Sequence, residues 1–451
     1  MSSHPVRSHA VNRLPALAGP AAWNAILGPQ AARPALEGPR TADVVIIGAG
    51  FGGLSAARRL HQLQPRARVI VLDASRIAES SSGRNSGFMI DLPHDLASDD
   101  YAGSGDDRAV IAVNRHGIAF AREAVAEYGI DRNYFDPVGK VNGAVSAKAL
   151  AHNESYARHL ATLGEHSEML DARQMAEMTG SQHYTGGLYT PGTVMLQPAG
   201  YIRGLAAGLE RDGIEIMEDS AVLGLDRMGA SWRVRTGRGH VDAGRVILTV
   251  NGHLESFGFE RGRLMQLFLY AAMTPELGAD ALRRLGGQPR WGITPSDPMG
   301  TTMRRIDSGQ GGNRIITRTC ATLRPNTVVT GADVSRAARV MQRKFDERFP
   351  QLAGMRMEYA WSGHLCLTRN GVAVMRQLDD GLFAGCVENG LGTCRSTLTG
   401  AGAAELACGE TSLITRHFTQ QERPTRLPPQ PFQQIGANIY MRWREFRASK
   451  E

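Results

Sequence analysis

The chain has 451 residues, a formal net charge of +7, 42% hydrophobic residues and 21% charged residues. That length allows two or three structural units, and the composition is typical of a globular protein with a large core. No apolar run reaches the roughly 18 residues of a membrane-spanning helix, and residues 1–40 lack the pattern of a signal peptide. We therefore expect no membrane span and a cytoplasmic protein.

Arginine supplies nearly all of the positive charge, because the lysines are Lys140, Lys148, Lys344 and Lys450 alone. The arginines are scattered over the whole chain, without the basic and aromatic clustering of a nucleic-acid-binding face, so no nucleic-acid partner is expected. A site that binds carboxylates suits guanidinium groups, which form two parallel hydrogen bonds with them. The five cysteines form no CxxC pair, so neither a disulfide framework nor a metal site is expected.

Residues 1–40 are rich in proline and predict an irregular arm on the surface. The elements that follow the arm are predicted to form a βαβ unit. The apolar run from Ala42 to Ile47 predicts a strand that is buried on both faces of a parallel sheet. Apolar residues at helical spacing from Leu54 to Leu63 predict a helix, and Arg68 to Asp73 predicts a second buried strand.

Glycines in the spacing GxGxxG, namely Gly48, Gly50 and Gly53, lie between the first strand and the helix. They allow a tight turn, close approach of the backbone to a pyrophosphate, and close packing of the helix on the sheet. Asp73, at the end of the second strand, is placed to bind ribose hydroxyls. The pattern predicts a dinucleotide site and does not separate NAD from FAD. Its candidate cofactor-binding residues are Gly48, Gly50, Phe51, Gly52, Gly53, Asp73 and Ala74.

The segment from Ser80 to Met89 separates the two cofactors. It is a small, polar, glycine-bearing loop soon after the second strand, suited to wrap phosphates and then pass beside an isoalloxazine ring. An NAD dehydrogenase does not need such a loop, so FAD is the expected cofactor. The candidate residues here are Ser82, Arg84, Asn85, Ser86, Gly87, Phe88 and Met89.

The remaining chain alternates between two patterns. A polar, helical block resembling a cap runs from about Asp95 to Thr190, with an amphipathic helix around 110–128. The α/β pattern returns near Pro198, gives way to an irregular or β-rich block from about Glu260 to Glu358, and then closes the fold. The expected domains are residues 1–40 as the arm, 41–93, 197–255 and 359–418 as the nucleotide domain, 94–196 and 256–358 as a substrate-binding domain, and 419–451 as a tail docked as a surface helix.

At the loop from Ser80 to Met89 the sequence resembles the glycine oxidase and D-amino acid oxidase superfamily of flavoproteins, especially its branch of gamma-glutamylputrescine oxidase-like amine oxidases. The resemblance extends from Thr41 to about Gly409. It implies an α/β fold with a Rossmann-type FAD-binding domain assembled from discontinuous segments and an α+β substrate-binding domain built from two insertions. It also implies that Val222 contacts adenine and that the segment containing Asn251 lies beside the flavin diphosphate.

A glycine-rich segment from Phe383 to Cys394 is similar to the C-terminal strand, loop and helix of that superfamily. Glycines let backbone amides approach the pyrimidine end of a flavin, and a helix that starts near Thr393 directs its positive end there, which favours the reduced cofactor. The candidate residues are Gly385, Asn389, Gly390, Leu391, Gly392 and Thr393.

The resemblance implies oxidation of an amine: hydride passes to flavin N5, the imine hydrolyses, and O2 is reduced to H2O2. In this superfamily an arginine soon after a Trp-x-Gly element binds the substrate carboxylate, whereas Leu365 occupies that place here, after Trp361 and Gly363. A carboxylate could instead be bound by Arg304 or Arg305, or by the strand from Arg314 to Arg318. Because neighbouring side chains of a strand point to opposite faces, at most one of Arg304 and Arg305 faces the pocket. Surface ion pairs remain the alternative for each of these arginines.

His364 is a candidate catalytic residue that could accept a hydrogen bond or a proton from the amine, or else a packed core histidine. Cys366 lies near the position at which sarcosine oxidases attach their flavin, although we expect noncovalent FAD. The expected function is an oxidase of a small carboxylate-bearing primary or secondary amine of the gamma-glutamyl-polyamine, N-alkylglycine or iminodiacetate type. The alternatives are a dehydrogenase that passes electrons to a quinone or carrier protein and a noncatalytic flavin sensor. The oligomeric state stays open, a homo-oligomer included.

Overall fold

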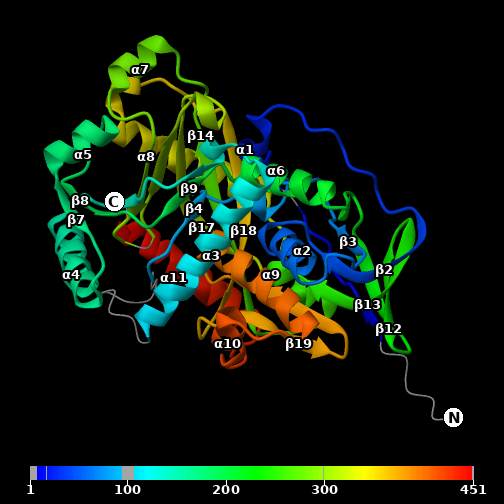
Figure 1. Ribbon diagram of the computed structural model, residues 1–451. Coiled ribbons are helices and arrows are strands. Elements are labelled where there is room, and N and C mark those ends of the chain that lie inside the picture. Colours follow the sequence, from blue (N-terminus) through cyan, green and yellow to red (C-terminus); the bar gives the residue numbers. More distant parts are fainter. Residues whose placement is uncertain (1–7, 17, 94–105, 298, 449–451) are drawn as a thin grey trace.

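The computed structural model describes residues 8–16, 18–93, 106–297 and 299–448. The described chain forms two large β-sheets with helices packed around them (Figure 1). This mixed α/β architecture confirms the expected fold class.

The first sheet has nine strands, and its centre is parallel. β2 (Gly38–Ile47) pairs with β3 (Val69–Leu72) on one side and with β13 (Gly239–Leu248) on the other. The parallel set continues through β10 (Glu215–Met217) beside β3 and β20 (Leu382–Cys386) beside β13. The remaining strands of this sheet are β1 (Ser8–Ala10), β11 (Val222–Met228), β12 (Ser231–Thr236) and β19 (Val374–Asp379).

Helices cover this sheet, and among them α2 (Phe51–Leu63) packs directly against α9 (Gly392–Cys408). A Cβ atom on Gly400 of α9 would lie 1.9 Å from the carbonyl oxygen of Gly52 in α2, so the two helices can meet only through glycine. α3 (Asp107–Tyr128) packs against α9, and the three helices lie together at the front of the molecule (Figure 1). α6 (Pro198–Arg211) completes this layer beside α2 and α3.

The second sheet has eight strands in the order β18-β14-β17-β16-β15-β6-β8-β7. Their bounds are Tyr359–Thr368, Leu264–Met273, Arg314–Leu323, Thr302–Ile306, Trp291–Pro295, Lys140–Ala144, Gly186–Thr190 and Glu168–Asp171, in that order. A small third sheet joins β4 (Phe88–Met89), β9 (Val194–Leu196) and β5 (Phe135–Asp136). Because β18 pairs with β14, the segment that begins at residue 359 belongs in its first ten residues to the second sheet and not to the nucleotide domain.

Helices surround the second sheet as well: α4 (Ala147–Leu163), α5 (Ala172–Thr179), α7 (Ala279–Leu285) and α8 (Gly331–Arg348). The expectation of an irregular or β-rich block up to Glu358 missed α8. Its start is marked by a capping box, in which Thr330 and Asp333 each bind the other's backbone N–H group. Its apolar residues Met341 and Phe345 are buried against the sheet.

The N-terminal arm is better ordered than the sequence indicated. β1 extends the first sheet beside β11, and a short helix, α1 (Ala22–Ala25), buries Trp23 completely, at 0% exposure. The indole N–H of Trp23 donates to the carbonyl oxygen of Asn85 at 2.8 Å. Most of the described arm is irregular, as predicted, but it does not lie wholly on the surface, because one large aromatic ring can fix a proline-rich segment to the core.

The C-terminal tail forms α10 (Leu413–Thr419) and α11 (Phe432–Arg447). α11 covers the edge of β17 beyond Arg318, where β16 no longer pairs with it. There the backbone N–H groups of Ala321 and Leu323 donate to Glu445 at 2.9 Å and to Asn438 at 3.0 Å. Side chains of α11 therefore replace a strand partner.

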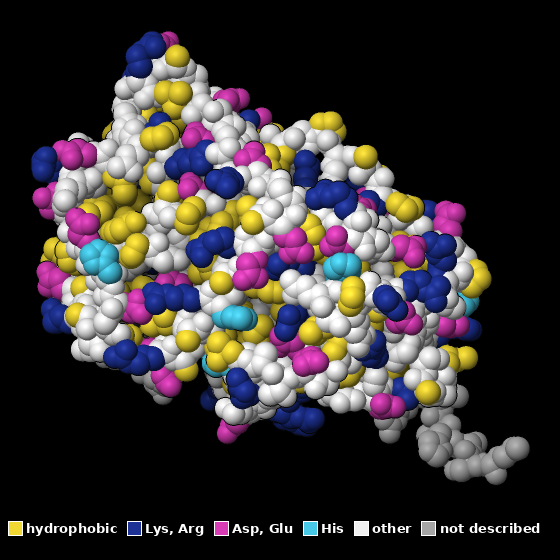
Figure 2. Space-filling view, viewed as in Figure 1, with side chains coloured by type: hydrophobic (Ala, Val, Ile, Leu, Met, Phe, Trp, Pro, Cys, Tyr) yellow, Lys and Arg dark blue, Asp and Glu magenta, His cyan; other side chains and the backbone are white. Residues whose placement is uncertain are grey.

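Positive and negative side chains are interspersed on the face that Figure 2 shows. Within the described ranges, no helix is long and apolar enough to cross a membrane. In the same part of the chain, no group of three or more His, Cys, Asp or Glu side chains is placed to hold a metal ion.

Candidate active site

A cavity of ≈ 590 Å³ is lined by residues of both sheets. Its wall combines the glycine turn after β2, the loop after β3, the residues after β13 and the glycine-rich loop after β20. β14, β17 and β18 of the second sheet, helix α11 and part of the N-terminal arm also line it. Segments that are hundreds of residues apart in the sequence therefore meet around one space.

The glycine turn has the geometry that the GxGxxG spacing predicted. Gly48 has a φ of +104°, which favours glycine, and a Cβ atom on Gly53 would lie 1.7 Å from the carbonyl oxygen of Gly48. A Cβ atom on Gly50 would lie 2.3 Å from the hydroxyl oxygen of Ser82. The turn thus touches the loop that follows β3, and the first N–H groups of α2 are available for an anion.

Asp73 lies on the cavity wall where β3 ends. Its carboxylate accepts hydrogen bonds from the backbone N–H groups of Ala49 at 2.7 Å and Ser75 at 2.8 Å. Burial raises the pKa of Asp73, although these two N–H groups act in the opposite direction. Val222 and Ala74 line the same end of the cavity.

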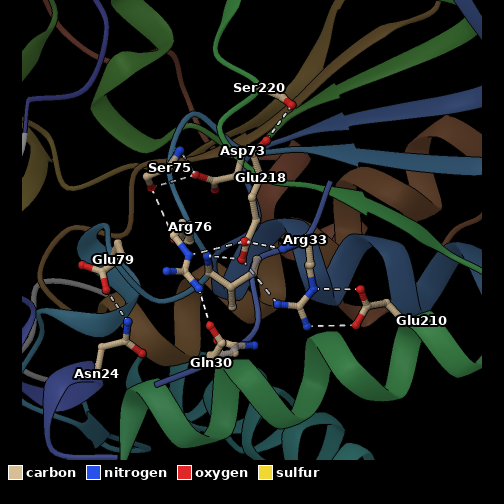
Figure 3. A network of polar contacts seen from close by, with 11 residues as sticks. Asn24, Gln30, Arg33, Asp73, Ser75, Arg76, Glu79, Glu210, Glu218 and Ser220 are labelled. Atoms are coloured by element: carbon tan, nitrogen blue, oxygen red, sulfur yellow. Dashed lines mark hydrogen bonds and ion pairs between the residues drawn. The ribbon is translucent and has the colours of Figure 1, made fainter. Parts of the chain in front are cut away.

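A buried polar network supports this end of the cavity (Figure 3). Glu218 is 1% exposed and accepts hydrogen bonds from the backbone N–H groups of Arg33 and Ile77, both at 2.8 Å. The backbone N–H of Ser220 donates to the carbonyl oxygen of Asp73 at 2.7 Å. Arg33 also pairs with Glu210 of α6 at 2.8 Å, so the N-terminal arm joins α6 to the end of β3.

The loop from Ser80 to Met89 is held by its own polar side chains. The Asn85 amide donates to the carbonyl oxygen of Ser82 at 2.7 Å and accepts from the N–H of Gly87 at 2.8 Å. The Arg84 guanidinium donates to the carbonyl oxygens of Glu79, Ala18, Gly19 and Ser362. Ser82, Arg84, Asn85, Ser86 and Phe88 all line the cavity.

Arg304 does not line the cavity, which corrects the expectation that it binds substrate. It is 1% exposed and donates to the carbonyl oxygens of Ser86, Gly87 and Leu196, and its guanidinium lies over the Trp23 ring at 5.0 Å. Through these contacts the Arg304 guanidinium holds the loop that precedes Met89.

Arg305 and Met89 also lie away from the cavity wall. Arg305 donates to the carbonyl oxygen of Gly286, the residue after α7. Met89 is 0% exposed and packs in the hydrophobic core, so it does not approach the cavity as expected. Gly53 is likewise a packing residue, as its clash with Gly48 shows.

The segment from the end of β20 to the start of α9 contributes most of its predicted residues to the wall: Gly385, Gly390, Leu391, Gly392 and Thr393. The Thr393 hydroxyl donates to the carbonyl oxygen of Phe88 at 2.7 Å, which joins this segment to the one that follows β3. Asn389 does not line the wall; its side chain accepts from the N–H of Thr368 and donates to the carbonyl oxygen of Val372, each at 2.8 Å.

His364 lies on the wall beside Gln266. The Gln266 amide nitrogen donates to Gly252 at 3.0 Å and to Glu255 at 3.1 Å, so the amide oxygen must accept from Nε2 of His364, 2.8 Å away. Burial and the neighbouring His253 ring lower the pKa of His364 to about 3. The imidazole is therefore neutral at physiological pH, with Nδ1 as its remaining acceptor.

We expect His364→Asn to leave the pH dependence of kcat/KM unchanged between about pH 5 and 9, because a group with a depressed pKa holds no proton in this range. Steady-state kinetics across that range would check this, with His253→Asn as the matched control. Loss of one limb of the profile in the His364 variant alone would mean that this histidine does exchange a proton with substrate.

Arg318 lines the cavity and ends the run from Arg314 to Arg318 that the sequence named as a possible carboxylate-binding strand. It pairs in register with Thr302 of β16 and Ala271 of β14. Because Leu267 lies four residues before Ala271 and pairs with Leu365, alternation puts Arg318 and Leu365 on the same sheet face. Burial lowers the pKa of Arg318 to about 10, so it stays charged at neutral pH.

No oxygen atom among the described residues pairs with the Arg318 guanidinium. The other arginines of the wall all have partners: Arg84 as described above, Arg13 at the carbonyl oxygen of Pro325, and Arg444 at 3.9 Å from Asp297. Arg318 is partly buried, and a partly buried cation without a partner is typical of a side chain that pairs with a ligand.

Glu388 is a charged wall residue that the sequence did not single out. It is 8% exposed, and its carboxyl accepts from the hydroxyl of Ser396 at 2.8 Å. Burial raises its pKa to about 7. A charged residue inside a glycine-rich loop was a signal that could have been noted.

The wall suits a flavin dinucleotide. The glycine turn leaves space that side chains would fill, Asp73 offers carboxylate oxygens at the far end, and the buried Asn251 Oδ1 has no partner among the described residues. Phosphates suit the start of α2, and hydroxyl and ring N–H groups suit the two oxygen acceptors.

Comparison with known proteins gives consistent results. Residues 43–406 match the family model described as FAD dependent oxidoreductase (DAO). Gamma-glutamylputrescine oxidoreductase of Escherichia coli is 28% identical over 410 residues, which cover 89% of this chain and 92% of that protein.

Among solved structures, glycine oxidase from Geobacillus kaustophilus has a TM-score of 0.67 at 17% identity, covering 85% of this chain and 100% of that one. Iminodiacetate oxidase from Chelativorans sp. BNC1 has a TM-score of 0.63 at 16% identity, covering 82% and 96%. At these identities the structures share the fold.

Proposed function

The chain belongs to the family of FAD-dependent oxidoreductases, and from this premise we propose that it oxidises a small primary or secondary amine that carries at least one carboxylate. The candidate substrates are of the gamma-glutamyl-polyamine, N-alkylglycine and iminodiacetate types. The names of two similar proteins, gamma-glutamylputrescine oxidoreductase and iminodiacetate oxidase, support this class.

The observation that carries the proposal is the unpaired Arg318 guanidinium on the cavity wall. A substrate carboxylate would accept two parallel hydrogen bonds from this guanidinium. Leu267, Leu269 and Leu365 line the same cavity, so the substrate between its carboxylate and its amine would contact an apolar surface. Such a surface excludes water and favours a neutral amine over an ammonium ion.

FAD, when bound, supplies the acceptor for the two electrons that leave the carbon–nitrogen bond. The chain's own part is to hold the cofactor through the residues that the sequence predicted on the wall and to bind and orient the substrate through Arg318. The neutral His364 contributes one hydrogen-bond acceptor, Nδ1, and no charge. Oxidation of the amine gives an imine that hydrolyses in water.

We propose that the FAD is held noncovalently. Cys366 is 0% exposed and does not line the cavity, and burial raises the pKa of its thiol well above the ordinary range. Burial also raises the pKa of Cys320, on the wall, to about 12. Neither thiol is disposed to form the thiolate that attachment requires.

Noncovalent binding predicts that acid precipitation of the purified protein releases all of its flavin into the supernatant. Absorbance of the supernatant and of the washed pellet checks this result. Flavin that remains in the washed pellet, and that stays attached to peptides when the pellet is digested, would contradict noncovalent binding.

A dehydrogenase that passes electrons to a quinone or a carrier protein is the second candidate. The observation in its favour is α11, whose outward residues Phe432, Ile435, Ile439, Trp443 and Phe446 are between 47% and 76% exposed. The same helix lines the cavity through Tyr440, Met441 and Arg444. An exposed apolar surface of this kind is typical of an interaction site.

The test is turnover of a panel of amines in air, with oxygen uptake and H2O2 measured together. We expect turnover of carboxylate-bearing amines with one H2O2 for each amine oxidised. Turnover with an added quinone and without H2O2 would favour the dehydrogenase. Failure of every carboxylate-bearing amine with both acceptors would overturn the proposed substrate class.

A further inference from the structure

Glu388 is a buried carboxyl group for which substrate binding offers no role. It lies in the loop between β20 and α9, at the cavity wall. Its partners are the Ser396 hydroxyl of α9, 2.8 Å away, and the side chain of Asn251, which follows β13. Both are neutral groups.

In the described part of the chain, no positively charged side chain faces Glu388 from the elements packed around it. Cys386 of β20 and Cys366 of β18 are its titratable neighbours, and burial keeps both thiols protonated. Among the described residues no arginine or lysine forms an ion pair with Glu388. Burial without a cation favours the protonated carboxyl, and its pKa is raised to about 7.

The residue that binds this carboxyl, Ser396, contacts the first turn of α2. A Cβ atom on Gly52, in the first turn of α2, would be 3.4 Å from the carbonyl oxygen of Ser396, the residue whose hydroxyl binds Glu388. A pyrophosphate at this helix terminus would bring negative charge near the carboxyl, and the cofactor would displace water from it. Both effects disfavour a carboxylate.

We propose that Glu388 binds FAD as a neutral carboxylic acid, which donates a hydrogen bond and adds no charge beside the phosphate site. Cofactor binding is then linked to one proton at this carboxyl. The inference rests on the family's cofactor and not on the proposed amine substrate.

The sign of the pH dependence follows from this linkage. If bound FAD stabilises the protonated form, affinity is full below the carboxyl's pKa and falls as the pH rises through it, by up to about tenfold per pH unit. The wall histidines do not contribute, because burial lowers the pKa of His253 to about 4 and that of His364 to about 3. Burial also raises the pKa of Asp73, the other carboxyl on the wall, so a variant of Glu388 is needed to assign the pH dependence to Glu388.

The test follows FAD release from the yellow holoprotein after dilution into buffers from about pH 6 to 9.5, through the rise in flavin fluorescence. We expect wild-type release to accelerate at least tenfold across this range. Glu388→Gln keeps a hydrogen-bond donor and cannot ionise, so its release should be slow and independent of pH. Circular dichroism at each pH separates release from unfolding.

Ser396→Ala is the second variant, and it leaves the carboxyl in place. It removes a donor that favours the carboxylate, so the onset of faster release should move to higher pH. Three outcomes overturn the proposal: pH-independent release from the wild type, the same pH dependence in Glu388→Gln as in the wild type, or rapid release from Glu388→Gln at every pH. None of these depends on finding a substrate.

Discussion

Replacing Arg318 by methionine is expected to lower kcat/KM for a carboxylate-bearing amine by about 30- to 1,000-fold while the FAD content stays at the wild-type level. The range corresponds to about 2–4 kcal/mol, which is typical of truncating one member of a hydrogen-bonded charge pair that a bound ligand removes from water. In the protein itself, Arg318 makes no hydrogen bond or ion pair to a described residue, so its removal leaves no protein group without a partner.

The measurement is the rate of flavin reduction against substrate concentration under anaerobic conditions. Arg305→Met is the matched control, because Arg305 is a neighbouring buried arginine that does not line the cavity, and its kinetics per bound flavin should match the wild type. Arg318→Lys should recover part of the loss, since it keeps the charge without the two-pronged geometry. Equal losses for amines with and without a carboxylate would contradict this role.

Gly53→Ala has the second large expected effect: protein that folds poorly and carries no FAD. The added methyl group would lie 1.7 Å from the carbonyl oxygen of Gly48, a backbone atom that cannot move without opening the turn. The overlap therefore separates α2 from β2 and destroys the phosphate site.

Flavin absorbance relative to protein absorbance, together with the yield of folded protein, measures this effect. Gly436→Ala in α11 is the control, since nothing lies within 4 Å of its added methyl group and alanine favours a helix. A Gly53→Ala protein with full flavin content would show that the turn tolerates a side chain.

The parts of the site that the sequence predicted are those fixed by local geometry. A glycine at Gly48 or Gly53 is required by a turn within six residues, and Asp73 follows a strand whose buried apolar run is visible in the sequence. The meeting of distant segments was predictable only through resemblance. The structure displays it directly in the contact between Gly50 and Ser82 and in the hydrogen bond from Thr393 to Phe88.

The substrate side was less predictable because it depends on strand register. The alternation of side chains along a strand predicted that at most one of Arg304 and Arg305 faces the cavity. In the structure neither of them lines the cavity wall. The inward arginine is Arg318 on the partner strand. Cys320, with a φ of +68°, interrupts the pairing of β17 with β14 two residues further on, and no sequence rule locates such a bulge.

Long-range packing explains the other differences. Trp23 anchors to the core an arm that was expected on the surface, and it also lies beneath the guanidinium of Arg304. Met89 was expected near the flavin from its position in the loop, but its side chain turns into the core. Loop position predicts where a backbone passes, whereas the direction of each side chain depends on its neighbours in the fold.

The central claim is that one cavity holds FAD and a carboxylate-bearing amine. Its most direct test is anaerobic titration of the purified protein with an N-alkylglycine, a gamma-glutamyl amine and iminodiacetate, each beside the analogous amine without its carboxylate. We predict that at least one carboxylate-bearing amine bleaches the visible flavin absorbance at concentrations at which its analogue does not. Protein without flavin, or equal bleaching by each amine and its analogue, would contradict the claim.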